Sequence, residues 1–145
     1  MRKMLLALMI PVLAAAACPA ADVTGPNTLD FEFQAREIRS GQLMDRPVVT
    51  ATSIARGIRI DARLNTPDPC RIITAEAGRE GGVISMNVMV QPRGGACIQV
   101  VGVFEYEALM RNLEPGNYRV RITHSFAATG SPGPHVVFDQ DVVVR

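Results

Sequence analysis

Apolar and polar residues alternate with a period of two through most of the chain after residue 28. Successive side chains of an extended strand point to opposite faces, so this period predicts strands with one buried and one solvated face. The strands of an all-parallel sheet are usually apolar on both faces and are joined by helices, and the sequence shows neither feature. The alternation occurs in segments 29–36, 58–64, 84–90, 98–108, 118–123 and 136–144, and more weakly in 48–53 and 71–77.

Short stretches rich in Gly, Pro and Asn separate most of these segments and predict turns. Seven or eight short strands at such a spacing are typical of an antiparallel two-sheet sandwich or of a barrel. Residues 105–112 could form a helical turn, but their alternation favours a continuing strand. The sequence therefore predicts one all-β domain over residues 28–145.

The first 17 residues have a different composition. Arg2 and Lys3 are followed by 14 uncharged, mostly apolar residues that end in four alanines. A positive start, a short apolar run and small residues at its end are typical of a secretory signal peptide. The run is too short to span a bilayer well, because a span takes about 20 residues. We predict a signal-peptide helix at 1–17, a tether at 18–27, and export of the domain.

Cys18 follows the signal segment directly and allows three cleavage products. Residues 15–18, Ala-Ala-Ala-Cys, resemble the lipobox of bacterial lipoproteins, with Ala15 where leucine is commonest. The resemblance implies cleavage before Cys18 and attachment of a lipid to its sulfur, which would anchor the domain to a membrane. Cleavage after Ala17 would leave a free thiol instead, and cleavage after Ala20 would remove Cys18.

Cys70 and Cys97 are the two cysteines that remain once Cys18 is lipidated or removed. An exported chain favours a disulfide between them, and a redox pair would usually be spaced as Cys-x-x-Cys. Each cysteine is predicted to open a strand, with segment 84–90 between the two strands. The first and third strands of a flat sheet are about 9.5 Å apart, which is too far for a disulfide. The bridge is therefore expected to join flanking loops or strands of different sheets.

Residues 113–118 read Leu-Glu-Pro-Gly-Asn-Tyr and precede alternating Val and Ile. This string resembles the corner before a late strand in immunoglobulin-like and fibronectin-III-like sandwiches, and also a string found in secreted carboxypeptidase-regulatory-like sandwiches. The resemblance implies an Ig-like sandwich of seven or eight strands in which the Tyr118 hydroxyl bonds to backbone upstream. The chain has no Trp and no cysteine two residues after Tyr118, so it lacks the Trp and the inter-sheet disulfide of antibody domains.

His124 and His135 are the only histidines of the chain. A hairpin centred on residues 129–130 would place them opposite each other, with Cβ atoms about 5 Å apart. Such a pair could share a metal ion, although no third ligand is evident in the sequence. The alternative is a strand-end histidine that bonds to backbone, and His124 continues the core-facing side of its strand.

The sequence contains no Gly-x-Ser-x-Gly, no His-Glu-x-x-His and no phosphate-binding Gly-rich loop. We therefore expect no enzymatic activity and no cofactor. Asp139 and Asp141 are expected on a solvated strand face, opposite Arg119 or Arg121. Loops 40–47 and 127–134 are the places where a sandwich of this kind would bind. The candidate binding residues in or beside them are Leu43, Met44, Thr129, Ser131 and His135.

The leading hypothesis is a non-catalytic, lipid-anchored domain of the bacterial cell envelope that binds a protein or a glycan through its loops. It resembles the many uncharacterised bacterial lipoproteins with one small Ig-like or fibronectin-III-like sandwich. A secreted Ig-like peptidase inhibitor is the alternative, and a periplasmic metal-binding protein is the third hypothesis. Nucleic acid is not an expected partner, because 15 basic residues less Arg2 and Lys3 leave 13 against 14 acidic ones.

Overall fold

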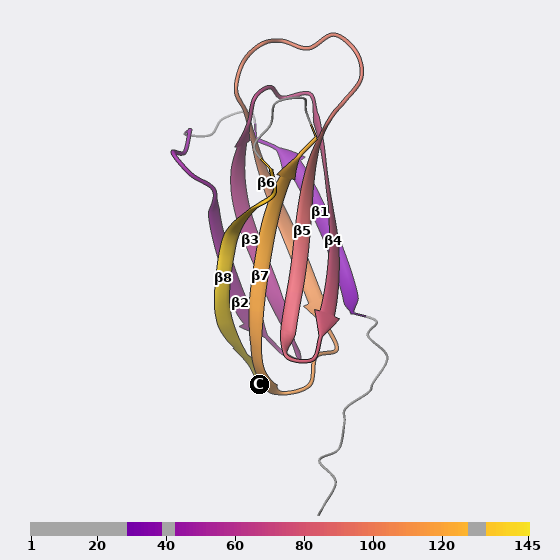
Figure 1. Ribbon diagram of the computed structural model, residues 1–145, viewed down its shortest axis with the longest axis vertical. Helices are drawn as coiled ribbons and strands as arrows, with labels where there is room; N and C mark the ends of the chain where they lie inside the picture. Colours follow the sequence, from indigo (N-terminus) through magenta and orange to yellow (C-terminus); the bar gives the residue numbers. More distant parts are fainter. Residues whose placement is uncertain (1–28, 39–42, 128–132) are drawn as a thin grey trace, which may run out of the picture.

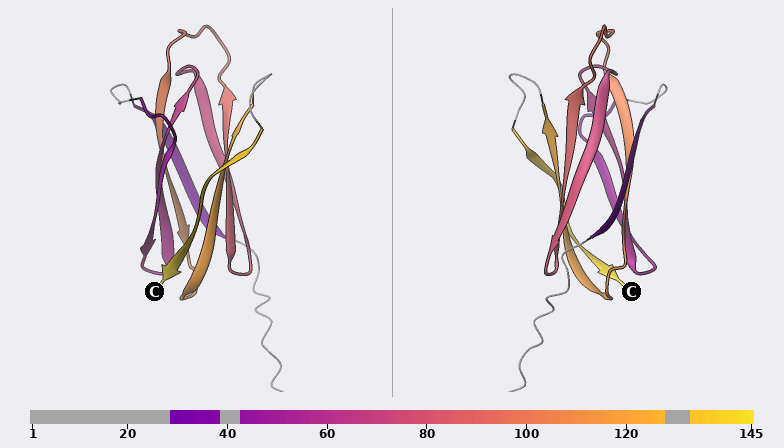
Figure 2. Two further views of the ribbon diagram at one scale, coloured as in Figure 1. Left: turned by 60° about the vertical axis from the view of Figure 1, so that its left-hand side comes forward. Right: turned by 90° about the vertical axis from the view of Figure 1, so that its right-hand side faces the viewer.

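The computed structural model of the chain describes residues 29–38, 43–127 and 133–145. This part of the chain consists of eight strands in two facing sheets (Figures 1 and 2). The described residues contain no helix long and apolar enough to cross a membrane. The predicted signal helix, the tether and Cys18 lie outside the described residues. The strands are β1 (Asp30–Glu37), β2 (Val48–Ile54), β3 (Gly57–Thr66), β4 (Arg71–Glu80), β5 (Val83–Pro92), β6 (Gly102–Arg111), β7 (Gly116–Phe126) and β8 (His135–Val144).

The two sheets have four strands each. The first has the order β1-β6-β3-β2 and the second the order β4-β5-β7-β8. The predicted all-β, two-sheet sandwich is confirmed. Its strand order differs from that of a constant-type immunoglobulin domain, in which the first strand pairs with the second. The two-sheet architecture is therefore the one that the sequence predicts, but the order of the strands in the sheets is not that of an immunoglobulin domain.

One strand pair departs from the predicted antiparallel arrangement. Five of the six pairings are antiparallel, whereas β5 and β7 are parallel neighbours. Two parallel strands need a long crossover between them. The chain supplies it by crossing to the opposite sheet, where β6 runs back before β7 returns beside β5. The alternation pattern contains no signal of this crossover, because β6 buries one face like the other strands.

The core lies between the inner faces of the two sheets, where alternate residues of each strand are buried. Burial of this apolar area is the main favourable term in folding, at about 25 cal/mol per Å². The inner rows match the predicted alternation in β3, β5 and β7. The fully buried apolar side chains of this core are Ile58, Ile60, Leu64, Ile84, Met86, Val88, Val90, Ala108, Met110, Leu113, Val120 and Ile122.

The prediction that segment 98–108 is one strand is wrong at its beginning. β6 begins at Gly102, which pairs with Thr66, the last residue of β3. Ile98 and Val100 precede this point and are 66% and 53% exposed. β3 ends at Thr66, so among the described residues no strand of the sheet continues beside them. The predicted continuation of the strand through residues 105–111 is confirmed.

The alternation in segment 136–144 predicts that Val136, Phe138, Val142 and Val144 share one face of β8, and this prediction is wrong at Val136. The register between β7 and β8 shifts between Ile122 and Thr123, so that Phe138 pairs with Ile122 and Val136 pairs with Thr123. Val137 is the extra residue of this bulge and packs against the core. Val136 therefore faces solvent, with an exposed fraction of 53%, and does not share the side of Phe138.

The corner before β7 forms as the resemblance implies. The Tyr118 hydroxyl donates a hydrogen bond of 2.9 Å to the backbone oxygen of Glu114. Leu113 is buried, and its backbone N–H donates to the oxygen of Arg56 in the β2–β3 turn. The corner therefore connects one end of the first sheet to the start of β7 in the second.

We expect the Tyr118→Phe variant to fold normally and to lose about 1 kcal/mol of unfolding free energy, since it removes one hydrogen bond to a carbonyl that water can reach. Equilibrium unfolding in urea measures this difference. An unchanged midpoint would show that the hydroxyl bond contributes nothing to the stability of the corner.

Candidate functional site at the loop end

The connections of the sandwich differ strongly between its two ends (Figures 1 and 2). We call the end at which β5 ends and β6 begins the loop end, and the opposite end, where β1 begins and β8 ends, the terminal end. Two-residue turns join β2 to β3 and β4 to β5 at the terminal end. The nine-residue connection from β5 to β6 lies at the loop end and rises above the strands in Figure 1.

Exposed apolar side chains gather in and beside the loop end. The described residues include nine large hydrophobic side chains that are exposed, and only Val83 and Val143 of these lie toward the terminal end. Isolated exposed apolar residues need no explanation, but a concentration of them indicates an interaction surface. The seven side chains in or beside the loop end are Leu43, Val48, Ile72, Ile98, Val100, Val101 and Val136.

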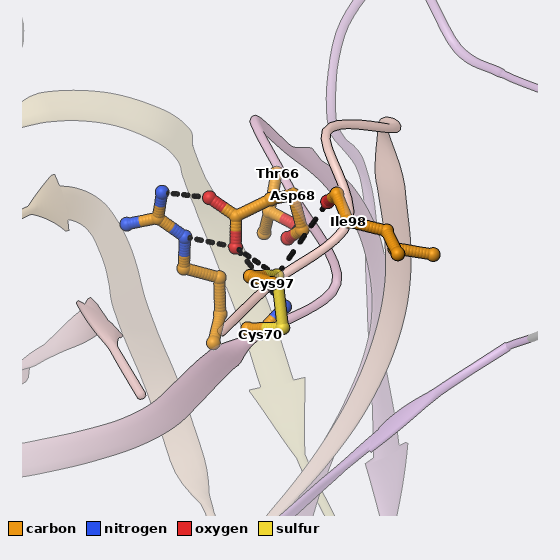
Figure 3. The surroundings of a disulfide bond; sticks show 6 residues. Thr66, Asp68, Cys70, Cys97 and Ile98 are labelled. Atoms are coloured by element: carbon orange, nitrogen blue, oxygen red, sulfur yellow. Dashed lines mark hydrogen bonds and ion pairs between the residues drawn. A yellow bond between two sulfur atoms is a disulfide. The ribbon is translucent and has the colours of Figure 1, made fainter. Parts of the chain in front are cut away.

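A disulfide between Cys70 and Cys97 fixes the loop of residues 93–101, as predicted (Figure 3). The Cα atoms of the two cysteines are 5.9 Å apart. Cys70 directly precedes β4 in one sheet, whereas Cys97 lies five residues before β6 in the other. The expectation that Cys97 opens a strand is thus wrong. The bridge joins two loops and also connects segments that lead into different sheets.

The turn before Cys70 forms a braced platform for this loop (Figure 3). Asp68 accepts hydrogen bonds of 3.0 Å from the Cys70 backbone N–H and from Arg71 Nε, and its carboxylate also pairs with the Arg71 guanidinium. The Thr66 hydroxyl donates to the backbone oxygen of Asp68 at 2.6 Å. Both partners of the Asp68–Arg71 pair are largely buried, with side chains 14% and 11% exposed, so the turn is fixed from several sides.

The far end of the loop is fixed by close packing at Gly102. A Cβ atom at this position would lie 2.6 Å from Thr66 Oγ1 and 2.8 Å from the backbone oxygen of Asp68. No side chain larger than hydrogen fits there, so the loop enters β6 directly against the braced turn. The start of the loop is held by a 2.8 Å hydrogen bond from the Arg93 N–H to the Cys70 oxygen. Residues 98–101 therefore form a short apolar tip between two fixed points, Cys97 and Gly102.

The same turn contains the one cluster of potential metal ligands that the described residues offer: Asp68, Cys70 and Cys97. A thiolate, and not a disulfide sulfur, is the metal ligand that cysteine provides. Because the two cysteines are bonded to each other, the cluster is a structural brace in this state of the protein.

The two histidines lie opposite each other, as the hairpin register predicts. His124 is fully buried on the core side, and its Nε2 forms a 2.9 Å hydrogen bond with the Tyr106 hydroxyl of the facing sheet. His135 is exposed, and its ring stacks on Phe126 with a centroid distance of 6.1 Å. The ring centroids of the two histidines are 6.0 Å apart. His124 thus bonds to a tyrosine and not to backbone, and no third metal-ligating side chain joins the pair among the described residues.

Burial controls the protonation of Tyr106 and His124, whose hydrogen bond connects the two sheets. Burial, and to a smaller extent electrostatic repulsion from the neighbouring His135, lower the pKa of His124 to about 4. Burial also raises the pKa of the Tyr106 phenol. Both groups are therefore neutral at pH 7. His124 Nδ1 is buried and has no hydrogen-bond partner among the described residues.

The outer face of the first sheet carries charged side chains in matched rows. Glu105 pairs with Arg36 and Arg63, and Arg59 pairs with both Asp61 and Glu107. A groove of about 820 Å³ lies over these rows. Its positive and negative charges balance, and exposed ion pairs of this kind contribute little to stability. The groove therefore shows no preference for an anionic or a cationic ligand.

The structure places three of the five candidate binding residues in the described part. Leu43 and Met44 line the groove, and the Asn65 side chain donates to the Met44 backbone oxygen at 2.7 Å. His135 is exposed at the start of β8. Thr129 and Ser131 lie outside the described residues. Their place in loop 40–47 predicts that Leu43 and Met44 are both exposed. Leu43 is 60% exposed, whereas Met44 is half-buried, so the prediction is wrong for Met44.

The expected pairing on β8 is present with both arginines. Asp139 accepts hydrogen bonds from Arg119 at 2.7 Å and from Arg121 at 3.0 Å. These bonds lower the pKa of the Asp139 carboxyl. The pairing places the aspartate on a solvated face, as predicted.

Comparison with models of protein families finds no match to this chain. Comparisons with curated proteins and with solved structures find none either.

We expect the buried histidine to make stability depend on pH. The folded-state pKa of His124, about 4, lies below the ordinary value of 6.5, so the unfolded chain binds the proton more readily. Unfolding free energy should therefore be constant above pH 6.5 and fall by about 3 kcal/mol as the pH drops to 4. Urea unfolding at several pH values measures this loss.

The His124→Gln variant should lack most of this pH dependence, because an amide accepts a hydrogen bond from Tyr106 but does not titrate. His135→Gln is the matched control and should retain most of it, since burial, the larger cause of the shift, is unchanged. Equal pH dependence in the His124→Gln variant and the original chain would show that other groups are responsible.

Proposed function

We propose that this protein is a non-catalytic, lipid-anchored domain of the bacterial cell envelope that binds another protein through its loop end. The observation that carries the proposal is the apolar tip at residues 98–101, held between Cys97 and Gly102. Fixing a loop in its binding conformation lowers the entropic cost of association. Exposed apolar side chains lower the solubility of a protein, so their presence here indicates a contact surface. A loop that is already fixed loses little conformational entropy when it binds a partner.

The position of the tip agrees with an anchor at Cys18. The described chain begins at Leu29, next to β1, at the terminal end. Strands of about ten residues at about 3.3 Å per residue separate this end from the loop end by about 30 Å. A chain anchored at Cys18 would therefore present the loop end away from the membrane. Residues 18–27 reach at most about 35 Å when fully extended, which keeps the domain close to the surface.

The chemistry of the tip favours a protein over a glycan. Ile98, Val100 and Val101 offer aliphatic surface, and their side chains provide no hydrogen-bonding groups for sugar hydroxyls. Buried centres of protein interfaces are apolar and depleted of charge, as this tip is. The nearest charged side chains of the braced turn, Asp68 and Arg71, satisfy each other.

The intact mass of the protein from its own envelope fraction tests the anchor. We expect a chain that begins at Cys18 and carries the added mass of acyl groups. Reduction and alkylation should add the mass of two further modified thiols, from Cys70 and Cys97. A mass that begins after Ala17 or Ala20 and carries no lipid would contradict the anchored location.

Site-specific crosslinking in intact envelopes tests the docking surface. A photoreactive residue at Val100 should give one defined adduct, and the same residue at Val143, which is equally exposed at the terminal end, should give none. Adding Ile98→Asp should reduce the Val100 adduct at least about tenfold, since a charge in an apolar contact is costly. Equal adducts from both positions would contradict docking through the loop end.

A further inference from the structure

The turn that braces the loop end also brings three potential metal ligands together. The carboxylate of Asp68 and the sulfurs of Cys70 and Cys97 lie within 4.8 Å of one another. Asp68 Oδ1 is 3.5 Å from Cys97 Sγ, and Figure 3 shows the carboxylate turned toward this sulfur. A sulfur and an oxygen bound to one tetrahedral zinc ion are separated by about 3.5 Å, because the bonds from zinc are about 2.3 and 2.0 Å long. The carboxylate therefore already has the spacing from Cys97 that a shared zinc ion requires.

We propose that reduction of the Cys70–Cys97 disulfide converts this turn into a zinc site. Asp68, Cys70 and Cys97 are the protein ligands, and a solvent molecule takes the fourth position of the tetrahedron. Thiolates suit both zinc and copper(I), whereas a carboxylate suits harder divalent ions, so the mixed set of ligands favours zinc. This inference goes beyond the proposed function and does not depend on it.

The disulfide has to open before the metal binds, because only the thiolate form of cysteine is a metal ligand. A dithiol reductant attacks one sulfur of the bridge and forms a mixed disulfide, which the second thiol of the reductant then resolves. The reductant leaves as a disulfide, and its two electrons and two protons pass to Cys70 and Cys97. Zinc displaces these two protons and binds both thiolates. With Cα atoms 5.9 Å apart, rotation about the Cα–Cβ bonds separates the sulfurs to the spacing of about 3.8 Å that two thiolates on one zinc ion have.

The groups around Asp68 orient its carboxylate and balance the charge of the site. The carboxylate accepts hydrogen bonds of 3.0 Å from the Cys70 backbone N–H and from Arg71 Nε. Hydrogen bonds of this kind hold a ligating carboxylate in place, and their loss typically weakens metal binding about 10–100-fold. Two thiolates and one carboxylate around Zn²⁺ leave one negative charge, which the Arg71 guanidinium balances. This balance is needed because the side chains of Asp68 and Arg71 are largely buried.

The site is accessible from the loop, and zinc would preserve the function of the disulfide as a brace. Cys70 and Cys97 are half-buried, and residues 93–96 and 98–101 around them are exposed, so a reductant and a metal ion can reach the sulfurs. Zinc joins the same two cysteines that the disulfide joins. The loop therefore stays fixed under reducing conditions when zinc is present, and is released when zinc is absent.

Cobalt binding tests the site, because Co²⁺ occupies zinc sites and reports its ligands by absorption. The experiment uses the full chain with Cys18→Ser, in which Cys70 and Cys97 are the only cysteines, reduced with a phosphine. We expect one equivalent of Co²⁺ to give the near-ultraviolet charge-transfer band of thiolate ligands and the intense visible bands of tetrahedral cobalt. Zn²⁺ should erase both, and the oxidised protein should show neither. A reduced protein without the charge-transfer band would overturn the proposal.

Two matched variants test the carboxylate ligand. Asp68→Asn keeps an oxygen that accepts the Cys70 N–H but removes the charge, so it should weaken zinc binding to the reduced protein at least about tenfold. Asp61→Asn makes the same change at an aspartate of β3 that pairs with Arg59, and should leave zinc binding unchanged. Competition with a chromophoric chelator measures both affinities. Equal affinity of the Asp68→Asn variant and the original would overturn the assignment of Asp68 as a ligand.

Thermal unfolding shows whether zinc binds the folded turn or only two thiols of an unfolded chain. The reduced protein should unfold at a higher temperature with Zn²⁺ than with a chelator, because a ligand of the folded state stabilises it. The double variant Cys70→Ser, Cys97→Ser should show no such difference. If the reduced chain is unfolded without metal, Zn²⁺ should restore the circular dichroism of the sheets. A reduced chain that Zn²⁺ neither stabilises nor refolds would overturn the proposal.

Discussion

Burial of one face of every strand between two sheets is the constraint on which this structure depends. The apolar residues recur at every second position, so each strand has one face to bury and the opposite sheet is where that face can go. β6 is the central element of this arrangement, because it pairs with both β1 and β3 and faces the second sheet through Tyr106 and Phe104. The buried Tyr106–His124 bond is the polar exception that connects the two layers.

The loop end derives its order from a different source. Its segments are too short and too exposed to be held by apolar burial. The disulfide, the Asp68–Arg71 pair and the packing at Gly102 hold them instead. Because these contacts hold the loop, the apolar side chains of residues 98–101 do not have to pack in the core. A side chain that the fold does not need is available for contact with a partner.

Local periodicity allowed much of the fold to be predicted, and its failures have physical causes. The inner faces of β3, β5 and β7, the disulfide and the register of His124 with His135 followed from pattern and spacing. The tyrosine corner followed from the resemblance of residues 113–118 to other sandwiches. Ile98 and Val100 continue the alternation of β6, so only the end of β3 at Thr66 shows that they leave the sheet.

The parallel β5–β7 pair and the bulge at Val137 depend on contacts between distant strands, which alternation does not encode. The candidate site was predicted only in part, because its loop conformation also depends on contacts between distant segments. Leu43 was recognised as an exposed loop residue and Met44 as a loop residue beside it, whereas the apolar tip was hidden inside a predicted strand. The Pro-rich turn before Cys70 and the pair Gly94–Gly95 were the sequence signals of the interruption.

The pairing of β1 with β6 has a consequence for folding during synthesis of the chain. Glu32 and Arg111, which form an ion pair across these strands, are 79 positions apart in the chain. β1 therefore has no partner strand until most of the polypeptide has emerged from the ribosome. Until then Phe31 and Phe33 remain uncovered, and native contacts between such distant segments form slowly. The first sheet is therefore completed late, only after both of its distant segments have been synthesised.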